Sequence, residues 1–285
     1  MLSINGHIQD KICMVTGATA GIGLVTATAL ARQGAAVIIA SRNSQRCAET
    51  ASHIRQETGN ERIDYLAADL SSQAQIRQMV QEFRKRYDRL DVLVNNAGAF
   101  YMRRQESVDQ IEMTFALNHL NYFLLTNLLL DVIEASAPAR IVNVSSDAHR
   151  GGQIRFDDLQ SQKKFSGWRA YAQSKLANVL FTYELARRLE GKGITVNALH
   201  PGFVATRFAE NNGALYKAAM SFVHLFARTP EQGARTSIYL ASSPQVEGVS
   251  GKYFTDEKPV DSDPASYDQA SARRLFQVSA EMTGL

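Results

Sequence analysis

Short apolar runs rich in β-branched residues alternate with helix-length segments along most of this chain of 285 residues. Within each run the apolar residues are continuous, which is typical of parallel strands that helices cover on both faces. The alternation predicts an α/β fold with a doubly wound sheet of about seven parallel strands and helices on both faces. The predicted strands are Ile12–Val15, Ala36–Ala40, Ile63–Ala68, Val92–Asn95, Ile141–Val144, Ile194–Leu199 and Lys252–Phe254.

Glycines mark where several of the intervening helices should end, because a left-handed residue after the last turn favours glycine. No proline-rich or low-complexity segment divides the chain, so residues 1–285 are expected to form a single domain. The predicted boundaries are Gly34 after Leu24–Gln33, Gly59 after Asn43–Thr58 and Gly191 after Ala177–Glu190.

The composition narrows the classes of partner. There are 31 basic and 28 acidic residues, a net charge of +3, and the basic residues are scattered, so no nucleic-acid partner is expected. Cys13 and Cys47 are too few for a disulfide framework and lack metal-site spacing, so both are expected to be buried thiols and no metal is expected.

The first ten residues show no basic segment followed by an apolar one, as a signal peptide would. The longest apolar stretch, Phe115–Leu130, is interrupted by polar residues such as Asn118 and falls short of the ~20 apolar residues that a membrane span needs. We therefore expect a cytoplasmic protein without a membrane anchor.

A glycine-rich turn, Thr16–Gly23, follows the first predicted strand and leads directly into a helix. Gly17 would allow the tight turn, Gly21 the close approach of a pyrophosphate, and Gly23 the packing of helix on strand. The helix N-terminus would attract the phosphates. A tight turn needs glycine in any case, but the position in the first βαβ unit favours a Rossmann-type dinucleotide site.

The end of the second predicted strand indicates which dinucleotide binds. NAD sites carry an acidic residue there for the ribose 2′-hydroxyl, whereas an arginine suits the 2′-phosphate of NADP. Here Ser41 and Arg42 supply a hydroxyl and a guanidinium and no carboxylate. The sequence favours NADP(H) over NAD(H), with a solvated arginine at a helix start as the alternative interpretation of Arg42.

Tyr171 and Lys175 are four residues apart in a predicted helix, so the phenol and the ammonium lie on one face. A cation beside a tyrosine, helped by an oxidised nicotinamide, is expected to lower the phenol pKa from ~10. Tyr171 could then exchange a proton with a substrate oxygen. The spacing alone is also compatible with an ordinary surface pair.

Together these motifs resemble the short-chain dehydrogenase/reductase family over about 190 residues. Further segments look like the branch of the retinol dehydrogenases and WW-domain oxidoreductases: Ile154–Leu159, Tyr171–Leu180, His200–Gly202 and Ser250–Phe254. The segments that carry the family resemblance are Thr16–Gly23, Asp69-Leu70, Asn95–Gly98, Asn118, Val144–Ser146, Tyr171–Lys175 and Pro201-Gly202.

The resemblance implies a catalytic set of Ser146, Tyr171, Lys175 and Asn118. Ser146, preferred over Ser145, would hydrogen-bond the substrate oxygen and fix it for hydride transfer. Lys175 would also bind the nicotinamide ribose. Asn118 would hold a water that links Lys175 to solvent, unless it is only an internal hydrogen-bonding residue of its helix.

The resemblance also implies the rest of the cofactor site. Asp69 would meet the adenine edge, although a helix N-cap is the alternative role, and Pro201-Gly202 could be only a turn. The predicted cofactor-binding residues are Gly17, Thr19, Ala20, Gly21, Ile22, Gly23, Ser41, Arg42 and Asp69; Leu70; Asn95, Ala97 and Gly98 at the central portion; Tyr171 and Lys175; and Pro201, Gly202, Val204 and Thr206 around the carboxamide.

Aromatic and aliphatic residues gather in residues 203–228, which we interpret as a lid over an apolar substrate, with core or subunit interface as the alternative. The predicted function is an NADP(H)-dependent oxidoreductase that interconverts a carbonyl and an alcohol on a bulky apolar molecule. The candidate assemblies are a homodimer and a homotetramer. Two other functions are weighed against this one: a nucleotide-sugar epimerase or dehydratase, for which too little chain follows Pro230, and a redox-sensing NADP(H)-binding regulator.

Overall fold

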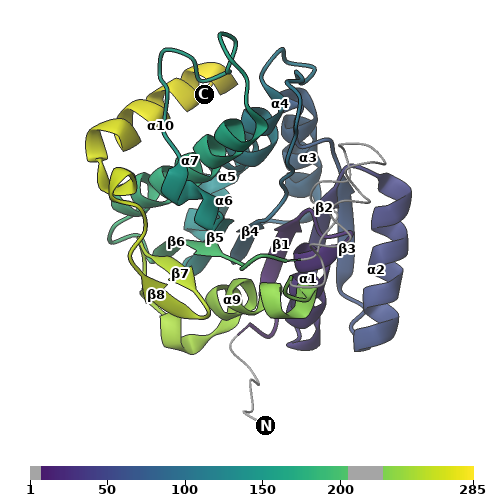
Figure 1. The fold of residues 1–285 in the computed structure, drawn as a ribbon. Helices are drawn as coiled ribbons and strands as arrows, with labels where there is room; N and C mark the ends of the chain where they lie inside the picture. The colour runs from purple at the N-terminus through teal and green to yellow at the C-terminus, as the bar shows by residue number, and fades with distance from the viewer. Residues whose placement is uncertain (1–7, 205–226) are drawn as a thin grey trace.

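Eight strands form one sheet at the centre of the protein, in a computed structural model that describes residues 8–204 and 227–285 (Figure 1). The strand order is β3-β2-β1-β4-β5-β6-β7-β8, and every neighbouring pair up to β7 is parallel. The doubly wound α/β prediction is confirmed. The strands are β1 (Ile12–Thr16), β2 (Ala36–Ser41), β3 (Ile63–Ala67), β4 (Val92–Asn95), β5 (Ala139–Val144), β6 (Ile194–His200), β7 (Tyr253–Thr255) and β8 (Lys258–Val260).

The eighth strand is the difference from the predicted sheet of about seven strands. β8 is short and exposed and runs antiparallel to β7. Asp256 and Glu257 join the two strands with φ values of 50° and 63°, the left-handed backbone that a two-residue hairpin turn requires. These residues are not the Asn-Gly or Asp-Gly pair that usually signals such a turn, so the sequence pattern did not indicate the hairpin.

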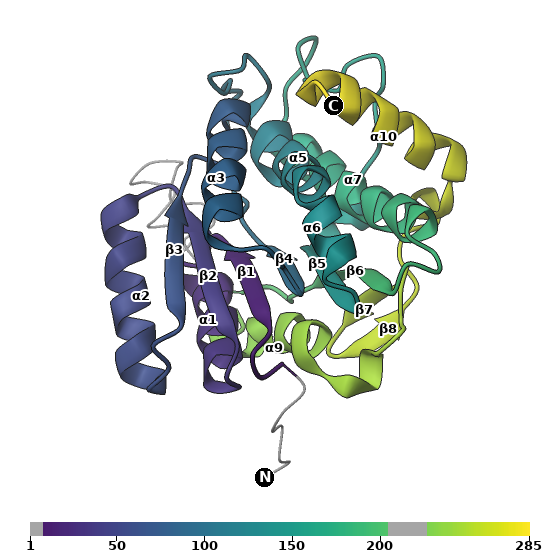
Figure 2. The same ribbon diagram turned by 180° about the vertical axis from the view of Figure 1, so that it is seen from behind.

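Helices cover both faces of the sheet. One face carries α1 (Gly21–Arg32), α2 (Ser44–Thr58) and α9 (Pro230–Ser242). The opposite face, seen in Figure 2, carries α3, α5, α6 and α7, and α10 packs against α7. The remaining elements are α3 (Gln73–Arg86), α4 (Met113–Phe115), the π-helical turn η1 (Ala116–Leu120), α5 (Asn121–Leu128), α6 (Leu130–Ala135), η2 (Asp147–Gly151), α7 (Gly167–Arg188), η5 (Pro244–Val246), η6 (Pro264–Tyr267) and α10 (Gln269–Thr283).

The two covered faces explain why the strand sequences are apolar throughout. In β1, Cys13 and Val15 pack under α1 and α2, whereas Met14 packs under the helices of the other face. Neighbouring side chains of a strand point to opposite faces, so both sets must be apolar. Cys13 and Cys47 are buried free thiols, as expected.

Local signals set several helix ends. Asn43 caps α2 by accepting a hydrogen bond from the backbone N–H of Arg46, and Gly59 ends the helix with a φ of 70°, as predicted. The sequence predicts a helical segment over Ala177–Glu190 that ends before Gly191. Helix α7 starts earlier, at Gly167. Tyr171 and Lys175 therefore lie in its first turns. Across residues 8–204 and 227–285, no helix combines the length and apolar character that crossing a bilayer requires.

The strand order reverses between β1 and its two neighbours, β2 and β4. In open α/β sheets, ligands bind in the crevice beyond the carboxyl ends of the strands at such a reversal. The functional site is therefore expected at this edge of the sheet.

Candidate active site

A cavity of about 1050 Å³ lies at the carboxyl ends of β1, β2, β4, β5 and β6. Its lining comes from the loops that follow these strands and from the first turns of α1 and α7. The structure brings most of the predicted site residues to it: Gly17, Thr19, Ala20, Gly21, Ile22, Gly23, Ser41, Arg42, Asp69, Leu70, Ala97, Gly98, Ser146, Tyr171, Lys175, Pro201, Gly202 and Val204.

Two predicted residues among those that the structure describes, Asn95 and Asn118, are not part of this lining. Asn95 is fully buried beneath it, and its Nδ2 donates to Thr126 Oγ1 and Asn143 Oδ1, both at 2.9 Å. Asn118 also lies behind the cavity wall. Thr206 lies outside the described residues.

The predicted lid, residues 203–228, is described only at its ends, since residues 205–226 lie outside the described ranges. Those ends meet at the rim of the cavity. The backbone N–H of Arg228 donates to the carbonyl of Phe203 at 2.7 Å, and Val204 pairs with Arg228 as an isolated bridge. The Arg228 side chain forms an ion pair with Asp256 and covers Gly202, where a Cβ would lie 2.5 Å from its Cδ.

The glycine turn forms a cradle of backbone at one end of the cavity. Gly17 has a φ of 68°, and a Cβ at Gly23 would lie 2.5 Å from the Gly17 carbonyl oxygen, so both positions need glycine. Ala20 precedes α1 without a side-chain cap, and no acidic residue lies in the first turn. The first N–H groups of α1 are thus available to an anion, which fits the pyrophosphate of a dinucleotide.

Asn96 anchors this turn and was missed in the sequence, although it lies inside the quoted motif Asn95–Gly98. Its Nδ2 donates to the carbonyl of Thr16 at 2.8 Å, and its backbone N–H donates to Thr16 Oγ1 at 2.8 Å. These hydrogen bonds tie the loop after β4 to the end of β1. They fix the distance between the two loops that form the floor of the cavity.

Two arginines stand at the cavity end next to β2. Arg42 and Arg46 are exposed, and within the described residues neither guanidinium takes part in an ion pair. Arg46 was not predicted, although a second arginine four residues after Arg42, at the start of the helix that follows β2, is the signal that could have found it. Nearby, Asp69 Oδ1 accepts from the backbone N–H and hydroxyl of Ser71 at 2.9 and 2.7 Å, which leaves the N-cap of α3 to Ser72.

Tyr171 lies at the other end of the cavity, and Ser146 lies there beside its phenol. Burial raises the Tyr171 pKa to about 12, against a lowering effect of the Ser146 hydroxyl. The expected lowering of the Tyr171 pKa by Lys175 is not seen. Burial also lowers the pKa of Lys175 to about 7, which favours the neutral amine, and a neutral amine does not stabilise a phenolate by charge.

Lys175 is held close to Tyr171 by the strand beneath it. Its Nζ donates to the carbonyl of Val144 at 3.0 Å and lies 5.7 Å from the centroid of the Tyr171 ring. Ser145 donates its hydroxyl to the Lys175 carbonyl at 2.8 Å, whereas Ser146 lies beside the phenol. The two serines that follow β5 thus have different surroundings. Ser145 binds the backbone of Lys175 in α7, and Ser146 lies in the cavity beside Tyr171.

Asn118 lies in the π-helical turn η1, and its side chain binds the loop that follows β4. Its Oδ1 accepts from the backbone N–H of Ala99 at 2.8 Å, and its Nδ2 donates to the Ala99 carbonyl at 3.0 Å and to Ser174 Oγ at 3.1 Å. The carbonyl of Asn118 accepts from Asn178 Nδ2 at 2.9 Å. These contacts match the alternative role of an internal hydrogen-bonding residue, and the predicted water-holding role stays a prediction.

Large apolar side chains surround the mouth of the cavity near Tyr171. Trp168 and Phe203 are 59% and 53% exposed, which is unusual for residues of their size, and Met113 and Leu117 line the same region. Phe100 packs edge-on against Tyr171 with ring centroids 5.9 Å apart. This end of the cavity therefore suits an apolar molecule.

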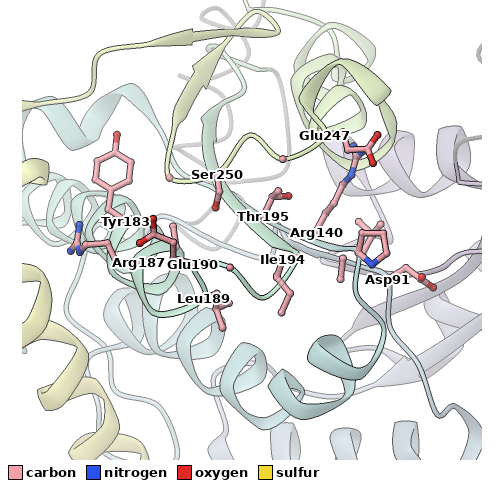
Figure 3. Close-up of a pocket in the computed structure, with 18 of the residues that line it drawn as sticks. Asp91, Arg140, Tyr183, Arg187, Leu189, Glu190, Ile194, Thr195, Glu247 and Ser250 are labelled. Atoms are coloured by element: carbon pink, nitrogen blue, oxygen red, sulfur yellow. The ribbon is translucent and has the colours of Figure 1, made fainter.

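A second cavity of about 1020 Å³ lies at the opposite edge of the sheet, and its labelled side chains are shown in Figure 3. Two of its charged side chains, Asp91 and Arg140, are bound within the protein. Asp91 binds Lys11 at 3.0 Å, and Arg140 donates to the carbonyls of Leu240 and Ser243 at 3.2 and 2.8 Å. None of the predicted site residues reaches it, so the first cavity is the candidate active site.

Comparisons with known proteins agree with this geometry. The sequence profile described as short chain dehydrogenase matches residues 11–217. The chain is 44% identical to retinol dehydrogenase 14 of Homo sapiens, covering 98% of this chain and 88% of that protein. It is also 44% identical to polyprenol dehydrogenase of Homo sapiens, covering 97% and 86%.

Solved structures share the fold. An uncharacterized protein from Mycobacterium Paratuberculosis matches with a TM-score of 0.79 and 31% identity, over 97% of this chain and 94% of that one. A short chain dehydrogenase from Shigella flexneri, complexed with NADP, matches with a TM-score of 0.70 and 28% identity, over 88% and 99%.

Proposed function

The chain belongs to the short chain dehydrogenase family, and on that premise we propose that it is an NADP(H)-dependent oxidoreductase that interconverts an alcohol and a carbonyl on a bulky apolar substrate. The observation that carries this proposal is a single cavity with Tyr171, Ser146 and Lys175 at one end and, at the other, two arginines that form no ion pair with any described residue. The family and the likeness to retinol dehydrogenases support the reaction class. The choice of cofactor, the substrate and the roles of individual residues are the proposal.

The cavity fits a phosphorylated dinucleotide. The uncapped start of α1 and the turn at Gly17 would hold the pyrophosphate, and Asp69 would meet the adenine edge with its second carboxylate oxygen. Arg42 and Arg46 would hold the 2′-phosphate by charge-assisted hydrogen bonds. The nicotinamide, when bound, supplies or accepts the hydride.

The protein's part of the chemistry is to hold the substrate oxygen and move one proton. The Ser146 hydroxyl would donate a hydrogen bond to that oxygen; Tyr171 would give it a proton as the phenol in reduction and would remove one as the phenolate in oxidation. A phenol of pKa about 12 is a weak acid, so a charged Lys175 at Nζ must favour the phenolate for turnover. We assign to Lys175 the role of stabilising the Tyr171 phenolate through its positive charge when cofactor and substrate are bound.

The apolar mouth supports a bulky apolar substrate. Trp168 and Phe203 are costly to expose in water, and a hydrocarbon chain that covers them would gain about 0.8 kcal/mol for each buried methylene. The relatives named retinol dehydrogenase and polyprenol dehydrogenase carry the names of apolar alcohols. We extend that substrate class, and no single compound, to this chain.

The test is a panel of aldehydes and ketones assayed by NADPH oxidation. We expect kcat/KM to rise with chain length until the apolar mouth is filled, with short polar aldehydes as poor substrates. Tyr171→Phe should abolish turnover and leave NADPH affinity nearly unchanged, because it removes the proton donor and little cofactor contact. Tyr183→Phe, a substitution of the same kind on α7 outside this cavity, is the matched control.

The alternative is a regulator that binds NADP(H) with little turnover. It predicts tight NADPH binding without consumption of any carbonyl in the panel, and Tyr171→Phe would then change nothing that the assay measures. The cytoplasmic location and the homodimer or homotetramer stay predictions.

A further inference from the structure

Two histidines bind the same peptide group, the one that joins Ser146 to Asp147. His149 Nδ1 lies 2.7 Å from the carbonyl oxygen of Ser146. His200 Nδ1 accepts a hydrogen bond from the backbone N–H of Asp147 at 3.0 Å. The carbonyl and the N–H belong to one planar unit, so one imidazole holds each side of it.

The partners fix the protonation of both rings. A carbonyl oxygen can only accept, so His149 must carry its proton on Nδ1, and its Nε2 accepts from the backbone N–H of Asp263 at 3.0 Å. His200 must leave Nδ1 unprotonated to accept from Asp147, so its proton is on Nε2. The two neutral rings are therefore opposite tautomers.

The surroundings hold these rings in place. His149 is fully buried, and its ring centroid lies 4.6 Å from that of Tyr253 on β7. His200 is the last residue of β6. Burial lowers the pKa of both rings and favours their neutral forms. The charged and titratable groups around His149 are Asp147, Arg150, His200, Tyr253 and Asp263, and those around His200 are Asp147, His149, Arg228 and Asp256.

The held peptide immediately follows the serine of the site. Ser146 has an extended backbone, with φ −163° and ψ 156°, and its Oγ accepts from the backbone N–H of Ala148 at 3.2 Å; Ser146 lines the cavity beside Tyr171. Rotation of the Ser146–Asp147 peptide changes ψ of Ser146 and moves η2. The hydroxyl could not then keep both the hydrogen bond from Ala148 and its place beside Tyr171.

We propose that His149 and His200 are positioning residues that clamp the Ser146–Asp147 peptide and thereby aim the Ser146 hydroxyl at Tyr171 and the substrate oxygen. The effect on turnover rests on the proposed function, and the geometry of the clamp does not. The first residue of η2 is thus oriented from β6 and from the chain before η6, segments more than 50 residues away in the sequence.

The first test measures the tautomers without turnover. In the wild-type protein at pH 7.5, long-range ¹H–¹⁵N correlation spectra of the imidazoles should show protonated Nδ1 for His149 and protonated Nε2 for His200. The same tautomer in both rings, or a doubly protonated ring in either, would overturn the clamp. This readout holds whether or not a substrate is known.

The second test is kinetic. His200→Leu removes the acceptor for Asp147, and we expect kcat to fall about 10-fold or more with KM for NADPH nearly unchanged, since a misplacement of about 1 Å can cost on the order of 10²-fold. His200→Asn places an amide oxygen at the position of Nδ1 and should restore most of the rate. His53→Leu, an exposed histidine on α2, is the control and should keep the wild-type rate.

Ser146→Ala shows whether His200 acts through the serine. In that background His200→Leu should have little further effect, because the group that it positions is gone. Independent, multiplying losses would overturn the clamp, as would a failure of Asn to rescue a folded His200 variant. A wild-type protein without turnover would instead refute the proposed function, and the tautomers would still decide the clamp.

Discussion

Replacing Arg42 by alanine should weaken NADPH binding and leave NADH binding almost unchanged. The guanidinium is exposed and has no ion pair among the residues that the structure describes, so its charge is available to a 2′-phosphate. A hydrogen bond to a charged group contributes about 1.5–3 kcal/mol, and solvent exposure favours the lower half of that range. The expected loss is about 10- to 30-fold in Kd for NADPH, since each 1.4 kcal/mol is about tenfold.

Arg46 lies in the first turn of α2, four residues after Arg42, and supplies a second charge. Arg46→Ala should reduce the affinity for NADPH less than Arg42→Ala does, and the double variant should bind NADPH and NADH with similar affinity. Arg42→Asp should reverse or erase the preference, because a carboxylate repels the phosphate. Binding of NADPH to the wild type should weaken with added salt more than binding of NADH.

The assay is a titration of each cofactor into each protein, followed by nicotinamide fluorescence, which needs no substrate. Arg273→Ala, an exposed arginine on α10, controls for the loss of one positive charge. Equal wild-type affinities for NADPH and NADH would refute the assignment. An equal loss of both affinities in Arg42→Ala would show that the residue supports the fold of the site and not the phosphate.

Three further outcomes follow from the same structure. Lys175→Ala should lower both kcat and NADPH affinity, which kinetics and fluorescence titration measure together; loss of kcat alone would remove its cofactor role. Gly23→Ala places a Cβ 2.5 Å from the Gly17 carbonyl oxygen and should cost about 1–3 kcal/mol in urea unfolding, and an unchanged midpoint would contradict that packing. Burial lowers the His119 pKa to about 4 in the folded protein, so as the pH falls His119 is protonated first in the unfolded chain. The contribution of the neutral, buried His119 to the free energy of unfolding is therefore complete above pH ~6.5 and is lost as the pH falls towards 4. Between pH 7.5 and 5 the wild type should lose about 2 kcal/mol more than His119→Gln, and parallel curves for the two proteins would refute this.

The sequence alone determined the features that depend on neighbours close in the chain. Continuous apolar runs such as Ala36–Ala40 indicated strands. Both faces of β2 are buried, so every position of the run is apolar. The turn Thr16–Gly23 and the pair Tyr171 and Lys175 were also readable, since a tight turn and one helical turn are set within eight residues. The sheet, the cradle and the juxtaposed tyrosine and lysine follow from these signals.

Only the tertiary structure decided which way individual polar groups point and how burial changes them. Asn95 has the family's motif position, yet its amide binds Thr126 and Asn143 beneath the cavity. The Tyr171 pKa is raised and not lowered, because desolvation depends on everything packed around the phenol. The peptide after Ser146 is held by His200 from a strand 53 residues away, and no local pattern encodes a contact that forms only when the sheet brings β5 and β6 together.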